Sequence, residues 1–296
     1  MRDPALLSVI LTVILLAGSS VYGQNAPCPI DSQTLQFVGK PIDQARCLLR
    51  PNGYGGVLGQ PLERLPRTLE KVIGSKVKFS RPAFLKYIAG LNVSESAIGG
   101  SLTDELSGAT IPDGSVIRAV YFIIHDTSTP NLRDEAFPVG FNEDPDWRGN
   151  KLDVWLKSPV AHVFVSRDGR SLTATPFSES VKKGWGTKFA RDYLKAPAKG
   201  LQLHIELVQP RRRDPRSKNP DNDLIAPTPG FSDAQYDRLA LLYATASLRR
   251  GTWLIPGFHS AIDAGIPDAH DDPQNFELAK FASSLDALLR SLDRLR

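Results

Sequence analysis

All five histidines of this 296-residue chain lie after residue 124, and two of them follow apolar runs that are typical of β-strands. His125 comes directly after the run 116–124, and His259 comes shortly after the run 252–255. Asp272 stands 13 residues beyond His259. Two neutral imidazoles and one carboxylate suit one catalytic zinc ion, because they leave the fourth coordination position to water. The residue types and positions therefore predict a zinc site at His125, His259 and Asp272.

The elements that must position these side chains can be read from apolar periodicity. The predicted strands cover 116–124, 161–165, 201–208 and 252–255. The third strand alternates, which puts His204 and Glu206 on one face. A capping-box pattern at Ser232 and Gln235 predicts the start of a helix that ends before Gly251, and a last helix begins near residue 276. Strands interspersed with helices predict an α/β fold with a central mixed β-sheet flanked by helices.

The first 23 residues have the pattern of a signal peptide. Their apolar stretch, 5–17, is 13 residues long, whereas a membrane-spanning helix needs about 20. Val21 and Gly23 place compact residues at the two positions that a signal peptidase reads, which predicts cleavage before Gln24, and the alternative is an uncleaved anchor. We therefore expect an exported protein with no stable membrane insertion after cleavage. The periplasm is the expected location, with extracellular release as the alternative.

Beyond the signal peptide the chain is predicted to divide at about residue 114. Residues 24–114 are rich in Gly and Pro, hold no histidine, and predict an N-terminal extension or small subdomain with short helices at 61–73 and 82–90. Residues 115–296 hold every candidate site residue and are predicted to form the catalytic domain. The arginine cluster 211–213 lies in a long polar loop, where it predicts a solvated surface.

The cysteine count and the charge balance narrow the class of protein further. Cys28 and Cys47 both follow the predicted cleavage point. An oxidising compartment favours a disulfide between them, and two unpaired buried thiols are the alternative. The net charge of +4 is too small to indicate a nucleic-acid-binding protein. The chain also lacks the HExxH helix of many zinc peptidases and the G-x-S-x-G turn of serine hydrolases.

Six short segments form a specific series along the second half of the chain. They are FIIHDTS, AHVFVSRDG, LHIELVQ, FSDAQYDRLALL, FHS and the pair Asp272-Pro273. In this order they resemble the zinc-dependent N-acetylmuramoyl-L-alanine amidases, which share a fold with phage amidase-type lysozymes and peptidoglycan-recognition proteins. The resemblance runs from about residue 116 to residue 286.

This resemblance implies roles for individual residues. It makes His125, His259 and Asp272 the ligands of one zinc ion. It places Glu206 at the family's catalytic glutamate, which would accept a proton from the attacking water and pass it to the leaving amine. His270 stands where relatives often carry a lysine that stabilises the oxyanion, and a protonated His270 would take that role. The alternative is that His270, instead of Asp272, is the third ligand.

Other positions depart from the family pattern or match it less closely. Trp185 is followed by Gly186, where many relatives have a Trp-His pair. His204 stands where a small residue is usual, and it either faces substrate or fills space. His162 matches a recurrent histidine of the second strand. We expect Trp185, His162 and His204 to line the substrate cleft.

The activity that the resemblance implies is hydrolysis of the amide bond between N-acetylmuramic acid and L-alanine. The partners would be peptidoglycan or its muropeptide fragments. One alternative is a peptidoglycan-binding module without catalysis. Another is a zinc peptidase that acts on stem peptides.

Overall fold

The computed structural model describes residues 27–295, so the predicted signal peptide lies outside the described residues and stays a prediction. The strands are β1 Ile30–Asp31, β2 Gln36–Phe37, β3 Gly108–Thr110, β4 Val116–Arg118, β5 Tyr121–Asp126, β6 Val163–Val165, β7 Ser171–Thr173, β8 Gln202–Leu207 and β9 Ile255–Phe258. The α-helices are α1 Pro41–Leu48, α2 Arg67–Val72, α3 Arg81–Gly90, α4 Lys195–Ala198, α5 Asp233–Arg250, α6 His259–Ile262 and α7 Leu278–Asp293. Within residues 27–295 no helix combines the length and apolar character needed to span a bilayer.

A five-stranded mixed sheet forms the centre of the molecule, which confirms the predicted fold class. Its strand order is β7-β6-β8-β5-β9. The strands β6, β8, β5 and β9 run parallel to one another, and β7 pairs antiparallel with β6 at the edge. Because parallel strands end at the same edge of a sheet, the side chains that follow β5, β8 and β9 meet there.

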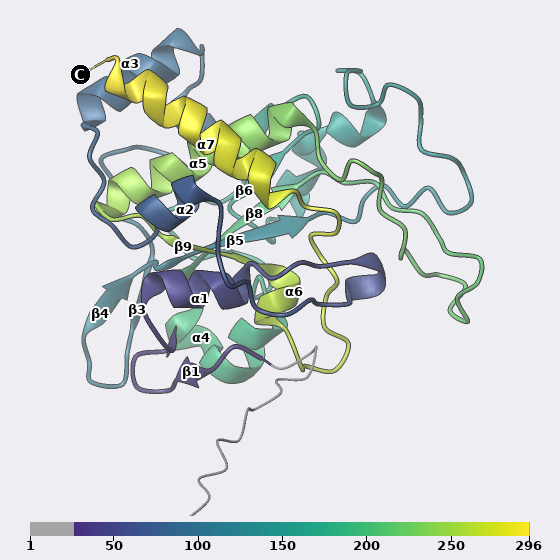
Figure 1. The fold of residues 1–296 in the computed structure, drawn as a ribbon, viewed down its shortest axis with the longest axis horizontal. Helices are drawn as coiled ribbons and strands as arrows, with labels where there is room; N and C mark the ends of the chain where they lie inside the picture. Colours follow the sequence, from purple (N-terminus) through teal and green to yellow (C-terminus); the bar gives the residue numbers. More distant parts are fainter. Residues whose placement is uncertain (1–26, 296) are drawn as a thin grey trace, which may run out of the picture.

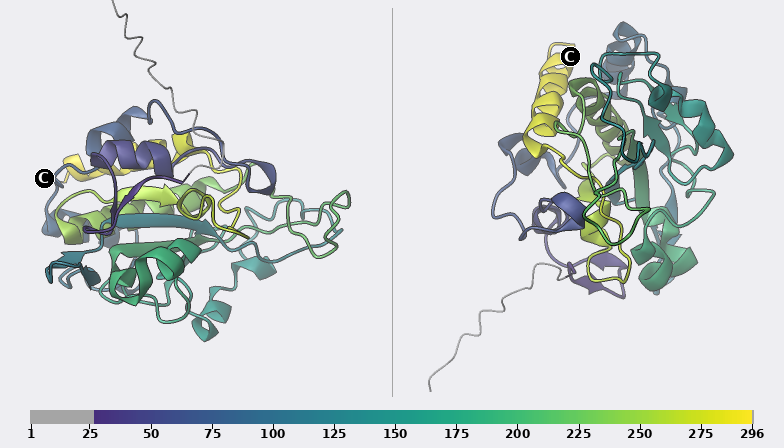
Figure 2. Two further views of the ribbon diagram at one scale, coloured as in Figure 1. Left: turned by 90° about the horizontal axis from the view of Figure 1, so that it is seen from below. Right: turned by 90° about the vertical axis from the view of Figure 1, so that its right-hand side faces the viewer.

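Helices cover both faces of this sheet (Figures 1 and 2). α5 and α7 lie on one face, where the ring of Phe122 in β5 packs against Tyr243 of α5 with centroids 5.2 Å apart. α1, α4 and α6 lie on the other face, where the Tyr121 hydroxyl donates a hydrogen bond to Gln44 of α1. Alternate residues of β5 therefore point to opposite helical layers.

The helix α5 begins where its sequence signals predict. The Ser232 side chain accepts from the backbone N–H of Gln235, and the Gln235 side chain accepts from the backbone N–H of Ser232. The helix ends at Gly251, which has a φ of 82°. A residue with a side chain is disfavoured in this left-handed conformation, so glycine is the natural stop.

Two of the predicted strands are wrong in their bounds. The run 116–124 is two strands, because β4 pairs with β3 as a separate hairpin and only β5 enters the central sheet. The run 252–255 contributes only Ile255 to β9, because Trp253 instead hydrogen-bonds to the backbone at Gly74 and Ser75. Apolar composition fits all these residues, but it does not reveal a change of partner strand.

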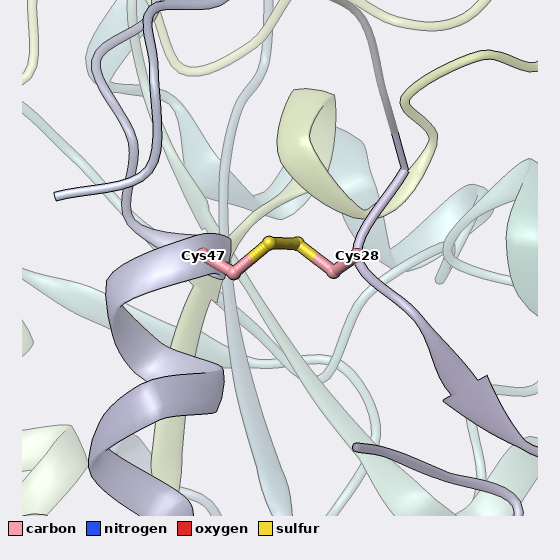
Figure 3. The surroundings of a disulfide bond; sticks show 2 residues. All are labelled: Cys28 and Cys47. Carbon is pink, nitrogen blue, oxygen red and sulfur yellow. A yellow bond between two sulfur atoms is a disulfide. The ribbon is translucent and has the colours of Figure 1, made fainter. Parts of the chain in front are cut away.

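The segment before residue 114 packs into the same hydrophobic core as the sheet. Leu48 of α1 and Phe84 of α3 are both fully buried in this core. A disulfide joins Cys47, near the end of α1, to Cys28 before β1 (Figure 3). The two cysteines are 19 residues apart, and closing a loop of this length contributes about 3 kcal/mol to the free energy of unfolding.

Candidate metal centre

The register of the central sheet brings the main site residues together. His125 in β5 lies opposite Glu206 in the neighbouring strand β8. On the other side of β5, Ile124 pairs with Phe258 of β9. The residues that follow them, His125 and His259, therefore lie side by side, and His259 begins α6. Figure 1 shows that the long connections after β5 and β8 extend from this same end of the sheet.

Asp272 reaches the site from a loop that is anchored at several points. The backbone N–H of Ser260 donates to the carbonyl oxygen of Asp272 at 2.8 Å. The backbone N–H of Asp126, directly after His125, donates to the Asp272 carboxylate at 3.2 Å. In return, the Asp126 carboxylate accepts from the backbone N–H of Gln274 at 3.1 Å. These bonds hold the Asp272 loop against the end of β5.

Arg211 also holds the Asp272 loop in place, and its burial shows that the predicted solvated surface at 211–213 is wrong for this residue. Its guanidinium donates to the Asp126 carboxylate at 2.6 Å, and its side chain is completely buried. A second carboxylate, on Asp271, lies 3.6 Å away. The cluster 211–213 is therefore not a uniformly solvated loop face, because its first residue is a buried structural cation.

The geometry of the three predicted ligands fits one zinc ion. His125 Nδ1 lies 2.9 Å from His259 Nδ1, and Asp272 Oδ2 lies 3.4 Å from the first and 3.2 Å from the second. Zinc bonds of about 2.0–2.2 Å in a tetrahedral arrangement place ligand atoms roughly 3.3–3.6 Å apart. The three atoms thus match a zinc triangle to within a few tenths of an ångström. All three residues are buried.

The protonation states of the three groups are strongly interdependent. Burial, followed by the charge on His259, lowers the pKa of His125 to about 4. Burial would also lower the pKa of His259, but the carboxylates of Asp272 and Asp263 outweigh it and raise that pKa to about 10. Burial opposes ionisation of Asp272, yet His259 and His125 hold its pKa well below the usual range. Without a metal, a proton on His259 therefore balances the Asp272 carboxylate, and a bound cation would take the place of that proton.

Glu206 lies at the edge of this triangle. One carboxylate oxygen is 4.0 Å from His125 Nδ1, and the side chain is only 15% exposed. The other oxygen, Oε2, is buried and has no hydrogen-bond partner within the described residues. Burial, together with the carboxylates of Asp272 and Asp126, raises the pKa of Glu206 well above its ordinary value. A carboxyl group in this setting is suited to exchanging a proton, which is the task of a general base.

The two histidines of the candidate metal site, His125 and His259, use their remaining ring nitrogens in different ways. His259 Nε2 lies 2.9 Å from an Asp263 carboxylate oxygen. The Asp263 carboxylate also accepts from the backbone N–H groups of Lys188 and Phe189, at 3.0 and 2.8 Å. His125 Nε2 instead lies 2.9 Å from His204 Nδ1. Sequence analysis missed Asp263, although its spacing of four residues from His259, one helical turn, was a usable signal.

The structure buries two of the residues that were expected to line a cleft. His162 is 0% exposed and His204 is 1% exposed. Burial lowers the pKa of His162 to about 4, and it lowers that of His204 well below its usual value. Neither ring forms part of an open wall in this structure, since both pack behind His125. Trp185 is half-buried, and the Lys199 ammonium lies 5.7 Å from its ring centroid.

His270 lies at the outer side of the triangle. Its ring centroid is 4.5 Å from that of His259, and its Nδ1 is 3.7 Å from an Asp272 oxygen. The side chain is 56% exposed, in contrast to the buried ligand set. His270 thus lies beside the compact group of potential metal ligands, which within residues 27–295 consists of His125, His259 and Asp272.

Comparisons with known proteins add little to this geometry. No family model and no curated protein matches the chain. A solved structure entitled "crystal structure of Se-Met AmpD derivative" is similar over 62% of this chain and 92% of that chain. The sequence identity is 18% and the TM-score is 0.34. Similarity at this level does not assign a function to this chain.

Proposed function

We propose that this protein is a zinc-dependent hydrolase that cleaves the amide bond between N-acetylmuramic acid and L-alanine in peptidoglycan or its fragments. The observation that carries the proposal is the convergence of His125, His259 and Asp272, with Glu206 beside them. A bound metal ion with a general base beside it is one established arrangement for the hydrolysis of an unactivated amide.

When bound, zinc would polarise the scissile carbonyl and lower the pKa of water toward about 7. Glu206 is the group within reach that can accept the proton of the attacking water and return it to the departing amine. Its Oε1 lies 4.0 Å from His125 Nδ1, beside the candidate ligands. His270, half exposed beside the ligand set, is placed to contact the developing oxyanion.

The substrate class follows from the resemblance of the sequence to the amidase family. Export through the predicted signal peptide would bring the protein to peptidoglycan in the periplasm. The presence of Glu206 beside all three candidate ligands favours catalysis over a peptidoglycan-binding module, since binding alone needs no proton acceptor at this place. A zinc peptidase on stem peptides would use the same metal chemistry on a different amide bond.

Mass spectrometry of muropeptides incubated with the purified protein tests the proposal. The expected products are a free stem peptide that begins with L-alanine and a sugar that keeps its lactyl group. Chelation of the metal is expected to abolish the reaction, and added zinc is expected to restore it. Cleavage between amino acids of the stem would establish the peptidase instead, and binding without any cleavage would establish the binding module.

A further inference from the structure

His204 is buried behind the metal triangle, on the same face of the sheet as His125 and Glu206. Its Nδ1 lies 2.9 Å from His125 Nε2. The other nitrogen of His125, Nδ1, faces His259 and Asp272. A metal-binding nitrogen must be unprotonated, so a neutral His125 that binds through Nδ1 carries its proton on Nε2. That proton points at His204 Nδ1, which is therefore the acceptor.

The ring of His204 is fixed by its own neighbours. The backbone N–H of His204 donates to His162 Nδ1 at 2.9 Å, and His162 Nε2 lies 3.0 Å from the carbonyl oxygen of Glu179. That carbonyl can only accept, so the proton of His162 is on Nε2. The two rings are nearly parallel, with an interplanar angle of 15° and centroids 5.8 Å apart. His162 thus supports His204 from behind.

Gly186 closes the other side of the His204 ring. A Cβ atom at position 186 would lie 2.3 Å from both Cε1 and Nε2 of His204. The φ of Gly186 is +76°, which also favours glycine. His204 Nε2 is buried and has no hydrogen-bond partner within the described residues. Among the described residues, His204 thus has one buried ring nitrogen, Nε2, without a hydrogen-bond partner. Its other ring nitrogen, Nδ1, contacts His125, and within residues 27–295 this contact is the one polar interaction that the ring makes with the candidate metal site.

We infer that His204 is a positioning residue, whose Nδ1 holds His125 in the tautomer and ring orientation that present Nδ1 to the metal. The Asp263 carboxylate holds the ring of His259 in the same way. His125 is thus held by an imidazole and His259 by a carboxylate. Such outer partners of metal-ligating histidines typically change metal affinity by about 10- to 100-fold when removed. The inference rests on the metal site of the proposed function, but not on its substrate.

The test compares two variants by zinc affinity, measured through competition with a chromophoric chelator. His204→Leu keeps the bulk of the side chain without an acceptor, and it is expected to weaken zinc binding by about 10- to 100-fold. His204→Asn can place an amide oxygen near the position of Nδ1, so its affinity is expected to stay close to that of the wild type. Thermal unfolding of the zinc-free variants separates loss of folding from loss of the acceptor.

Equal zinc affinities in the wild type and both variants would overturn the inference, because the Nδ1 acceptor of His204 would then have no effect. An equal loss of affinity in both variants would also overturn it, because the packing of the ring, and not its acceptor, would then determine zinc binding. Wild-type protein that binds no zinc would overturn both the inference and the proposed function. If the affinities follow the expectation but no muropeptide is cleaved, the inference holds and the proposed substrate is wrong.

Nuclear magnetic resonance of the zinc-loaded wild type provides a second test that needs no variant. With ¹⁵N-labelled histidine, His125 is expected to carry its proton on Nε2 and to show a coupling through the hydrogen bond to His204 Nδ1. A proton on His125 Nδ1, or an Nε2–H with no coupling to His204, would contradict the inference.

Discussion

Glu206→Gln is expected to lower kcat for amide hydrolysis by about 10²- to 10⁴-fold, the range typical of a general acid–base residue. The amide has nearly the same size as the carboxyl group, but it cannot accept the proton of the attacking water. Glu206 does not belong to the cluster of three candidate metal ligands. The zinc content of Glu206→Gln is therefore expected to stay at about one ion per chain. Muropeptide cleavage and metal analysis on the same preparation measure both quantities.

Glu135→Gln is a matched control, because Glu135 is an exposed glutamate on the loop after β5. It makes the same change from a carboxyl to an amide group, away from the site, and is expected to leave kcat unchanged. If Glu206→Gln retained wild-type activity, the general-base assignment would be wrong even with zinc bound. If it lost zinc together with activity, Glu206 would be a ligand instead.

Asp272→Ala is expected to lower zinc affinity by more than the roughly 10- to 100-fold expected when a hydrogen-bond partner of a metal-binding histidine, such as His204, is removed. Asp272 supplies the only negative charge among the three candidate ligands, and its carboxylate contacts both His125 and His259. The variant therefore loses a ligand and the charge that balances the cation. Metal analysis after dialysis is expected to find far less than one zinc per chain.

His270→Ala is the comparison that decides between the two candidates for the third ligand. The side chain of His270 is 56% exposed and that of Asp272 is 5% exposed, which favours Asp272. Zinc binding is therefore expected to survive His270→Ala, while kcat falls if His270 contacts the oxyanion. Zinc loss in His270→Ala together with zinc retention in Asp272→Ala would reverse the assignment.

The sequence predicted the sheet, the helix α5 and the cluster of His125, His259 and Asp272 because local patterns mark strand ends and helix caps. The capping box at Ser232 and Gln235 is a contact between residues three apart, and it predicts where α5 begins. His125 and His259 follow apolar strands, so their position at the strand ends was evident from the chain. The alternation in β8 was also real, but its polar face is not on the surface. His204 is buried there, and Glu206 is only 15% exposed at the candidate metal site.

Local sequence patterns did not predict the contacts between residues that are distant along the chain. Gly186 and His204 looked like two separate departures from the amidase family, yet in the structure the glycine leaves the room that the His204 ring occupies. Arg211 looked like part of a basic surface because nothing nearby in sequence shows that Asp126 pairs with it. Burial and pairing of charges depend on tertiary contacts, which a single sequence does not display.

Anomalous X-ray diffraction at the zinc edge, from crystals of the protein grown with zinc, shows whether these three side chains hold one metal ion. We expect one strong peak within about 2.0–2.2 Å of His125 Nδ1, His259 Nδ1 and an Asp272 oxygen, with the remaining position open to solvent. A peak elsewhere, or no peak at these three side chains, would show that they do not form the metal site.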